Sequence, residues 1–457
     1  MTRRKKPFSA SLAQADRRFH SLNLLLADYE PIVDLARDEA ILDNKQPASR
    51  YGSRDYADNR FYKALSTPLG PMAPDEREAQ AAPGDAVPAS SPVAARAQGP
   101  VQATAPGAEA LAAPPAAGPV LDPDKYFVLW ACCLAVDGYS RSLVCDLQRS
   151  TFTFIPNVLV EILELCKDRP IAAVYEHYQH QHDRQIDEYL QFLIGKEYGF
   201  LAASPQRFPA MSLDFRTPRA ITNCVIDFAP DTAHPLASIS AQLSQLFCQA
   251  VELRFFHAVS LAELTAVLDA FVDSTVRGIS VLTGAHPSLD RAALEVLLRQ
   301  HKRVKHVTIH STEGHDEVVR VDLHTTLRFT AERITSEACC GQVSPRYFHC
   351  NVEAFTEAVE HNSCLNRKVS IDARGAIKNC PSMPHSHGDI QTTPLASVVA
   401  NDAFQALWKV TKDQIAVCQD CEFRYICHDC RAYVADPAQP LSKPARCRYN
   451  PYQGRWE

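Results

Sequence analysis

The stretch Cys418-Gln-Asp-Cys421-Glu-Phe-Arg-Tyr-Ile-Cys427-His-Asp-Cys430 places four cysteines in one short segment near the C-terminus. Three further cysteines bring the pattern to seven of the sixteen in the chain: Cys364, Cys380 and Cys447. Thiolates are soft ligands that bind iron and zinc, and two cysteines separated by two residues can bind one centre from a single turn. The spacing therefore predicts metal ligands.

A predicted hairpin connects two of these cysteines. Residues 369–378 alternate apolar and polar side chains on either side of Asp372-Ala-Arg-Gly375. This pattern is typical of two strands joined by a tight turn, in which the glycine takes a positive φ. The turn would bring Cys364 and Cys380 to one place.

Three kinds of site compete for the thiols. Disulfides are disfavoured because the basic start, Thr2-Arg-Arg-Lys-Lys, has no apolar stretch behind it, so we expect no secretory signal and reduced thiols. Zinc needs only four thiolates, yet the two Cys-x2-Cys pairs lie closer together than in usual zinc fingers, and three cysteines would remain unused. Iron-sulfur clusters use all seven, and we favour them, while a zinc-stabilised interaction protein stays open.

The cysteine pattern resembles the SPASM domain, a twin-cluster module of many radical SAM peptide-modifying enzymes. The residues around the cysteines make the resemblance more specific: they resemble the SPASM-domain peptide maturases of grasp-with-spasm systems. Three segments carry this resemblance: Asn362-Ser-Cys-Leu-Asn-Arg-Lys-Val-Ser-Ile-Asp, Ile377-Lys-Asn-Cys-Pro-Ser-Met and Asp420-Cys-Glu-Phe-Arg-Tyr-Ile-Cys-His-Asp-Cys-Arg-Ala-Tyr. Those systems pair such a protein with an ATP-grasp ligase and a ribosomally made precursor peptide. One departure is visible, because Cys427 and Cys430 are separated by two residues where the family usually has three.

The resemblance implies two 4Fe-4S clusters. The first would be held by Cys418, Cys421, Cys427 and Cys447, and the second by Cys364, Cys380 and Cys430. The fourth ligand of the second cluster is open at this point: Cys340 is the first candidate, Cys350 the second, Cys339 could serve instead, and the position could stay free. Buried apolar thiols are an equally good interpretation of the Cys339-Cys340 pair.

Length and charge restrict the possible functions. The chain has 457 residues and a net charge of −6, which suits several domains and disfavours nucleic acid as a main partner. It has no apolar run of the eighteen or more residues that a membrane-spanning helix needs. We therefore expect a cytoplasmic protein that uses neither a membrane nor a nucleic acid.

The first part of the chain is expected to be poorly structured. Residues 1–72 form an arm with one predicted helix, over residues 9–28. Residues 73–121 are almost entirely Ala, Pro, Gly, Ser and Gln, a composition that cannot bury enough apolar surface to offset the entropy of ordering. This segment is predicted to be a flexible linker of unassigned role.

Residues 122–205 predict a winged-helix element. Apolar, β-prone runs at 127–136 and 142–155 are interrupted by turns at Asp137-Gly138 and Gln148-Arg-Ser150, and Asn157 is a good helix cap. Helical patterns follow at 158–166, 170–178 and 186–201. The outline resembles the PqqD-like element that captures leader peptides. The third helix carries Asp187, Glu188 and Glu197 against one lysine, so peptide is favoured over DNA.

Strands and helices alternate between residues 215 and 335. Strands are predicted at 223–228, 251–256, 278–282 and 304–309, and helices at 236–249, 261–274 and 291–301. Such units form parallel sheets with covering helices, and their place before the cysteine region resembles a partial radical SAM-like β/α barrel. Radical SAM chemistry needs Cys-x3-Cys-x2-Cys, yet no two cysteines here are four positions apart. We therefore expect no S-adenosylmethionine and no conventional radical SAM enzyme.

The sequence thus predicts an α/β protein with a winged-helix element, a degenerate β/α partial barrel and a SPASM domain at residues 336–457. Its function would be to bind a precursor peptide and act with an ATP-grasp ligase, with clusters that are structural or carry electrons. The alternative is an iron-sulfur enzyme that acts directly on the peptide, in which an iron left open at the Cys364 cluster does the chemistry. Catalytic residues stay unassigned.

Overall fold

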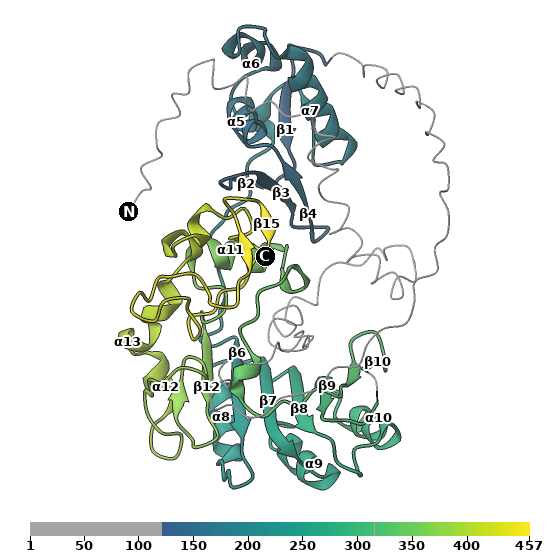
Figure 1. Ribbon diagram of the computed structural model, residues 1–457, viewed down its shortest axis with the longest axis vertical. Coiled ribbons are helices and arrows are strands. Elements are labelled where there is room, and N and C mark those ends of the chain that lie inside the picture. The colour runs from purple at the N-terminus through teal and green to yellow at the C-terminus, as the bar shows by residue number, and fades with distance from the viewer. Residues whose placement is uncertain (1–120, 315) are drawn as a thin grey trace, which may run out of the picture. The chain divides into compact units, whose positions relative to one another are not determined.

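The computed structural model describes residues 121–314 and 316–457, all of which belong to one compact unit. Residues 1–120, which hold the expected arm, its helix and nearly all of the expected linker, lie outside the described residues. The described part is mixed α/β, and its largest element is an eight-stranded, mostly parallel sheet (Figure 1).

The first described segment is a small sheet followed by three helices. Strands β2, β3 and β4 form an antiparallel sheet in that order, and β1 pairs with β5 in a separate two-stranded ribbon. The apolar residues of α5 recur every three or four positions and are buried in a core shared with α6 and α7. The elements are β1 (Tyr126–Leu129), β2 (Cys133–Val136), β3 (Ser142–Asp146), β4 (Thr151–Ile155), α5 (Asn157–Cys166), α6 (Ile171–His177), α7 (Asp183–Gly195) and β5 (Gly199–Ala202).

The third helix ends earlier than predicted, so the expectation of a helix up to residue 201 is wrong beyond Gly195. Glu197 adopts a left-handed φ of 57°, and residues 199–202 pair with β1 instead. Gly199 permits this close approach, because a Cβ there would lie 2.6 Å from the carbonyl oxygen of Val128. Pairing with a strand seventy residues away is a tertiary contact that helical periodicity does not contain.

The expected capping role of Asn157 is also wrong. Pro156 occupies the cap position of α5, without a side-chain hydrogen bond to the helix. The Asn157 side chain instead accepts a hydrogen bond from Ser142 Oγ (2.7 Å) and donates one to the carbonyl of Tyr139 (3.0 Å). Asn157 therefore fixes the connection between β2 and β3.

The large sheet confirms the predicted alternation of strands and helices. Its order is β10-β11-β9-β8-β7-β6-β12-β13, in which the six central strands are parallel and the two edge strands antiparallel. The elements up to the antiparallel edge are β6 (Asn223–Phe228), α8 (Leu236–Gln245), β7 (Ala250–Ala258), α9 (Leu261–Asp269), β8 (Gly278–Gly284), α10 (Arg291–Gln300), β9 (Val304–His310), β10 (Glu317–Arg320) and β11 (Thr326–Phe329).

The sheet crosses the expected boundary between residues 335 and 336. Strand β12 (Lys368–Ile371) lies parallel to β6, and β13 (Ile377–Lys378) pairs antiparallel with β12. The predicted hairpin is confirmed, since Asp372 to Gly375 connects these strands and Gly375 has a φ of +90°. The cysteine-rich part of the chain is therefore joined to the sheet by backbone hydrogen bonds.

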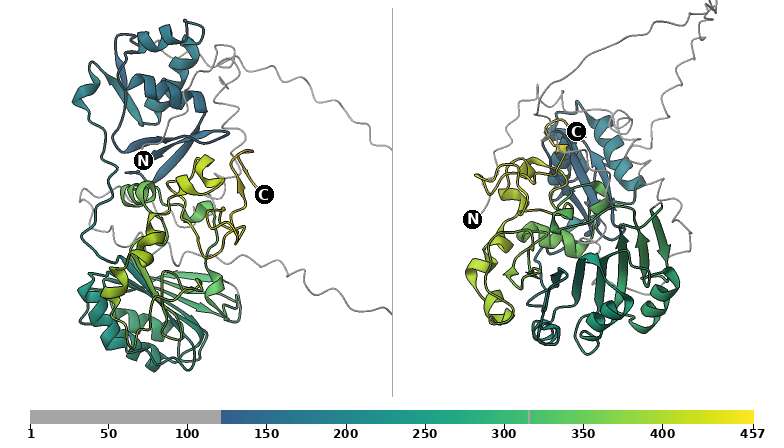
Figure 2. Two further views of the ribbon diagram at one scale, coloured as in Figure 1. Left: turned by 90° about the vertical axis from the view of Figure 1, so that its left-hand side faces the viewer. Right: turned by 60° about the horizontal axis from the view of Figure 1, so that its bottom comes forward.

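The two faces of this sheet differ in character. One face is apolar, and helices α8, α9 and α10 lie along it (Figures 1 and 2). On the other face, buried polar side chains occupy matching positions of neighbouring strands: Asp227 of β6, Glu252 and Arg254 of β7, Ser280 of β8, and His306 and Thr308 of β9. The candidate site lies against this polar face of the sheet.

Residues 336–457 contain little regular structure. Short elements alternate with loops: α11 (Val352–Glu360), α12 (Leu395–Val399), α13 (Asp402–Gln405), β14 (Tyr449–Asn450) and β15 (Arg455–Trp456). Their aromatic core includes Phe423 and Phe348, which pack against Phe152 of β4. The small N-terminal sheet and the cysteine loops therefore share one hydrophobic core.

Candidate metal centres

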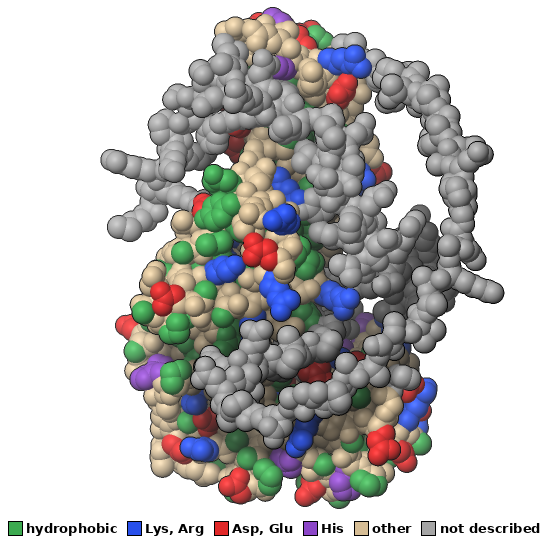
Figure 3. Space-filling view, viewed as in Figure 1, with side chains coloured by type: hydrophobic (Ala, Val, Ile, Leu, Met, Phe, Trp, Pro, Cys, Tyr) green, Lys and Arg blue, Asp and Glu red, His purple; other side chains and the backbone are tan. Residues whose placement is uncertain are grey.

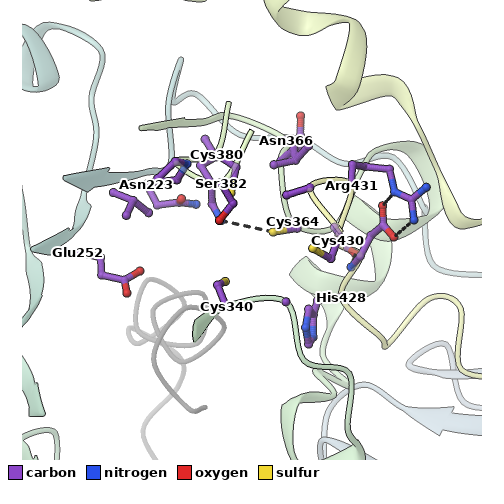
Figure 4. Close-up of a pocket in the computed structure, with 18 of the residues that line it drawn as sticks. Asn223, Glu252, Cys340, Cys364, Asn366, Cys380, Ser382, His428, Cys430 and Arg431 are labelled. Carbon is purple, nitrogen blue, oxygen red and sulfur yellow. Dashed lines mark hydrogen bonds and ion pairs between the residues drawn. The ribbon is translucent and has the colours of Figure 1, made fainter. Parts of the chain in front are cut away.

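Four cysteines from separate loops line one cavity of about 70 Å³ beside the polar face of the sheet (Figure 4). Cys364 precedes β12, Cys380 follows β13, and Cys340 and Cys430 come from loops before and after them. We call Cys340, Cys364, Cys380 and Cys430 the first quartet. The hairpin thus brings Cys364 and Cys380 together as predicted, and Cys340 is the additional cysteine that meets them.

Local structure fixes these positions. Asn362 Oδ1 accepts hydrogen bonds from the backbone N–H groups of Cys364 (3.1 Å) and Leu365 (2.9 Å). Gly341 has a φ of +91°, and a Cβ at this residue would lie 3.0 Å from Cys430 Sγ. A glycine next to Cys340 therefore allows its loop to approach Cys430.

Cys430 is buried and the other three cysteines of the first quartet are half-buried, and one lysine lies against them. Burial raises the pKa of Cys340, and burial together with the neighbouring Cys364 raises the pKa of Cys430 to about 12. Lys368 Nζ lies 3.4 Å from Cys364 Sγ. Burial opposes the charge of Lys368, but Cys364, Cys380 and Cys340 outweigh it and raise the pKa of the lysine.

A second quartet consists of Cys418, Cys421, Cys427 and Cys447. Burial raises the pKa of Cys427 to about 12; Lys412 counteracts this, while Cys447 and Cys418 add to it. The pKa of Cys421 is raised by burial, by Glu422 and by Cys427. Thiols that shift one another's pKa lie close together, so we treat these four cysteines as one group. Cys418 begins a short 3₁₀ helix, Cys418–Asp420.

Lys412 lies next to the thiols of the second quartet, as Lys368 lies next to those of the first. Its Nζ lies 3.9 Å from Cys418 Sγ, 3.8 Å from Cys427 Sγ and 3.5 Å from Asp429 Oδ1. Asp429 also pairs with Arg431, over 2.5 Å, and both of its partners help to lower the pKa of this buried carboxyl against the effect of burial. Cys427 and Cys430 flank Asp429 in the chain, so this residue stands between the two quartets.

The structure brings one group of metal-ligating side chains to zinc spacing within the described residues, and this group lies outside both quartets. A tetrahedral zinc site with Zn–S bonds of about 2.3 Å holds its sulfurs about 3.8 Å apart. Among residues 121–314 and 316–457, the one group of three ligand atoms that all lie within 4.8 Å of one another is Cys132, Cys133 and Asp146. In neither quartet do three thiols all lie within 4.8 Å of one another.

The Cys132, Cys133 and Asp146 group has a structural explanation. Asp146 Oδ1 accepts the backbone N–H groups of Gln148 (3.0 Å) and Arg149 (2.9 Å), and its other oxygen pairs with Arg149 (3.5 Å). The carboxylate is thus occupied in stabilising the turn between β3 and β4.

The other candidates for a fourth ligand lie elsewhere. The Cys350 thiol donates to the carbonyl of Thr151 at 3.0 Å, at the edge of the small sheet. Burial raises the pKa of Cys339 to about 11, with Arg254 acting against it. Neither residue lines the cavity of the first quartet. The structure therefore brings Cys340, and not Cys339 or Cys350, to the other three thiols.

The sequence did not point to three charged residues beside the thiols: Lys412 and Glu252, which are buried, and Lys368, which is half-buried. Glu252 of β7 lines the cavity, and burial raises its pKa to about 7, with Arg254 acting against this effect. Arg254 itself is bound to Asp227 by two hydrogen bonds of 2.7 and 2.8 Å. The one available sequence signal is that a charged residue begins the short strand β12 and that Glu252 lies within the largely apolar strand β7.

The loop after β6 holds a histidine and no cysteine. His234 Nε2 lies 3.0 Å from the carbonyl oxygen of Asp227, and its ring packs edge-on against Phe228. Burial lowers the pKa of His234. This loop therefore contributes no thiolate to either quartet.

Comparisons with known proteins find a remote structural similarity. No protein-family model and no curated protein sequence match the chain. Crystal structures of SuiB from Streptococcus suis align with it: SuiB bound to S-adenosylmethionine (9% identity, TM-score 0.32), SuiB alone (10%, 0.30) and SuiB bound to precursor peptide SuiA (8%, 0.27). Each alignment covers 71% of this chain and 98%, 99% and 100% of the SuiB chain, respectively. TM-scores this low support no conclusion about this chain.

Within the described residues, every helix is too short or too polar to cross a bilayer.

Proposed function

We propose that this chain is a maturation protein for a ribosomally made peptide, that it holds two 4Fe-4S clusters, and that it acts with an ATP-grasp ligase. Cys340, Cys364, Cys380 and Cys430 would hold one cluster, and Cys418, Cys421, Cys427 and Cys447 the other. The SPASM resemblance of the cysteine segments supports this assignment. The observation that carries it is that Cys340, Cys364, Cys380 and Cys430, from four separate loops, line one cavity.

The buried thiols fit such clusters chemically. Ionising a buried thiol is unfavourable without a nearby positive charge, and iron supplies that charge when it binds the thiolate. When bound, a 4Fe-4S cluster stores and passes single electrons. Reduced thiols are required for this ligation, which supports a cytoplasmic location.

Four thiols at the first quartet favour a fully ligated cluster. An enzyme in which an open iron acts on the peptide would need only three cysteines there, and Cys340 supplies the fourth. The loop after β6 has no cysteine to hold a third cluster for S-adenosylmethionine. We therefore propose that the clusters are structural or carry electrons, and that the partner ligase makes the new bond.

Residues 122–205 would bind the leader of the precursor, as the winged-helix resemblance implies. The ribbon of β1 and β5 has two strands, so each has one edge that pairs with no other strand of the described part. Trp130 and Phe208, 46% and 42% exposed, both pack against Phe200 of this ribbon. An open strand edge beside exposed aromatic rings is a typical surface for capturing an extended peptide.

Nucleic acid is a less suitable partner for the same surface. Both basic and acidic side chains are exposed on the face of the molecule seen in Figure 3, and the chain as a whole has a net charge of −6. Binding of a phosphate backbone depends on clustered lysine and arginine. A peptide that binds through backbone and aromatic contacts needs no such cluster.

The test is the iron, sulfide and zinc content of the full chain purified without oxygen, with electron paramagnetic resonance spectra of the reduced protein. We expect about eight irons and eight sulfides per chain and two 4Fe-4S signals. One or two zinc ions without sulfide would overturn the iron-sulfur proposal and leave a zinc-stabilised interaction protein. Co-purification with the ligase and precursor peptide would then test the partners.

A further inference from the structure

We propose that Lys368 and Lys412 are charge-compensating residues, each dedicated to one thiolate quartet, and that they set the reduction potentials of the two centres separately. This inference rests on the proposed iron-sulfur clusters. It concerns two residues that the cysteine pattern does not mark, and it assigns each a partner.

The first lysine is directed at the first quartet. Lys368 is half-buried in the cavity wall, and its Nζ lies 3.4 Å from Cys364 Sγ. The other charged groups nearby are paired with one another, Arg254 with Asp227 and Arg431 with Asp429. Apart from Glu252, the ammonium of Lys368 is therefore the uncompensated charge that faces these thiols.

The second lysine is directed at the second quartet. Only 4% of its side chain is exposed, and Nζ lies between Cys418 and Cys427. Asp429 does not neutralise Lys412 fully, since the same carboxylate also pairs with the buried Arg431. Lys412, Arg431 and Asp429 together leave one positive charge next to the thiols.

Burying an ammonium group without an anion costs several kcal/mol, so a lysine persists there only beside a negative partner. Four thiolates around a 4Fe-4S core supply such a partner, and the reduced cluster carries one more negative charge than the oxidised one. A fixed positive charge therefore stabilises the reduced form more than the oxidised form. Removing it should make the cluster harder to reduce.

The matched variants are Lys368→Met and Lys412→Met, which keep most of the side-chain volume but lose the charge, and Lys368→Arg and Lys412→Arg, which keep the charge. Lys378→Met is the control. Lys378 lies on the same hairpin and is also largely buried, but it pairs with Asp372 at 2.8 Å. It should therefore have no effect on either cluster.

The experiment is a redox titration of the anaerobically purified full chain, followed by electron paramagnetic resonance. We expect each methionine variant to lower the reduction potential of one cluster signal by at least about 59 mV, which corresponds to a tenfold change in the reduction equilibrium constant. Lys368→Met and Lys412→Met should act on different signals, and the arginine variants should stay near wild type. Glu252→Gln, measured in alkaline buffer, should shift the Lys368-dependent signal in the opposite direction.

Each outcome bears on the proposal. If a methionine variant loses its cluster and the arginine variant retains it, charge is required and the proposal stands. The proposal is overturned if both methionine variants keep their full iron content and their reduction potentials are unchanged. It is also overturned if the methionine and arginine variants both lose a cluster and Glu252→Gln shifts the potential of neither signal. Wild-type protein with zinc and no sulfide would instead overturn the clusters themselves, so the two failures are distinguishable.

Discussion

Arg141 donates a hydrogen bond from Nε to Oε1 of Glu422 over 2.7 Å, and both side chains are almost fully buried. Glu422 follows Cys421 directly, whereas Arg141 lies in the connection between β2 and β3 of the small N-terminal sheet. Tyr449 contacts both residues, and Arg424 pairs with Asp137 of the same connection. The segment proposed to bind the peptide is thus attached to the loop proposed to bind the second cluster.

Breaking this ion pair should be costly. Removing one partner of a buried pair leaves the other charge uncompensated, so we expect Arg141→Met or Glu422→Gln to lower the free energy of unfolding by about 3–5 kcal/mol. The double variant should cost less than the sum of the two. Urea unfolding of the two single variants and the double variant measures this coupling. Arg184→Ala, which breaks the exposed Arg184–Glu188 pair, should cost less than about 1 kcal/mol; equal losses in both pairs would contradict the prediction.

The close approach at Gly138 gives a second prediction. A Cβ at Gly138 would lie 2.9 Å from both the backbone nitrogen and the Cβ of Glu422. We expect Gly138→Ala to loosen the contact between the two segments, measured as a lower melting temperature and faster proteolysis of residues 122–205. Gly195→Ala is the control, because nothing lies within 4 Å of that Cβ and alanine favours the end of α7. A Gly138→Ala variant as stable as Gly195→Ala would show that the approach is not needed.

Substitution of single cysteines tests the assignment of the fourth ligand. We expect Cys340→Ser to reduce iron and sulfide and to alter one of the two cluster signals, because Cys340 lines the cavity with the other three thiols. Cys350→Ser should leave both signals unchanged, since that thiol is bound to the Thr151 carbonyl. Iron and sulfide analysis of the two variants is the measurement. The reverse pattern would make Cys350 the ligand.

Stability should depend on pH through His306. Burial lowers the pKa of His306 to about 4, and Lys305 adds to this effect. The unfolded chain, with a pKa of about 6.5, binds the proton first, so stability present above pH 6.5 is lost as the pH falls towards 4, by about 2 kcal/mol at pH 5. We expect His306→Gln to lose less stability than wild type between pH 7.5 and 5.0 in urea titrations. An identical loss in both proteins would remove His306 from the explanation.

Peptide capture can be tested on the exposed aromatic surface. We expect Trp130→Ala to weaken binding of a labelled precursor peptide at least tenfold, because an aromatic anchor beside a free strand edge contributes much of such binding. Fluorescence anisotropy measures the affinity. Leu323→Ala serves as the control, since Leu323 is 82% exposed but lies outside residues 122–205. Equal affinity of Trp130→Ala and wild type would place the peptide elsewhere.

The strands and helices between residues 223 and 310 could be predicted because each is long and periodic. The predicted and observed ends of β6 coincide, and those of β7, β8 and β9 differ by a few residues. The hairpin at Gly375 was equally readable from its alternation and its glycine. Predictions were wrong at Asn157 and beyond Gly195, where partners distant in sequence decide the conformation.

Glu422 and Arg424 show the same limit. Both lie between cysteines in the sequence, and Arg424 donates a local hydrogen bond to the carbonyl of Cys421. Their strongest partners, however, are Arg141 and Asp137, nearly three hundred positions earlier in the chain. No local pattern contains that information.

By itself, the sequence determined which thiols are available, how they are spaced and which segments alternate as strands and helices, because these are properties of neighbouring residues. Only the tertiary structure decided that Cys340 meets Cys364, Cys380 and Cys430, and that Lys368 and Lys412 each lie against one quartet. The physical reason is that parallel pairing of β12 with β6 brings distant loops to one side of the sheet. Buried charge can then be compensated only by the groups that this pairing brings together.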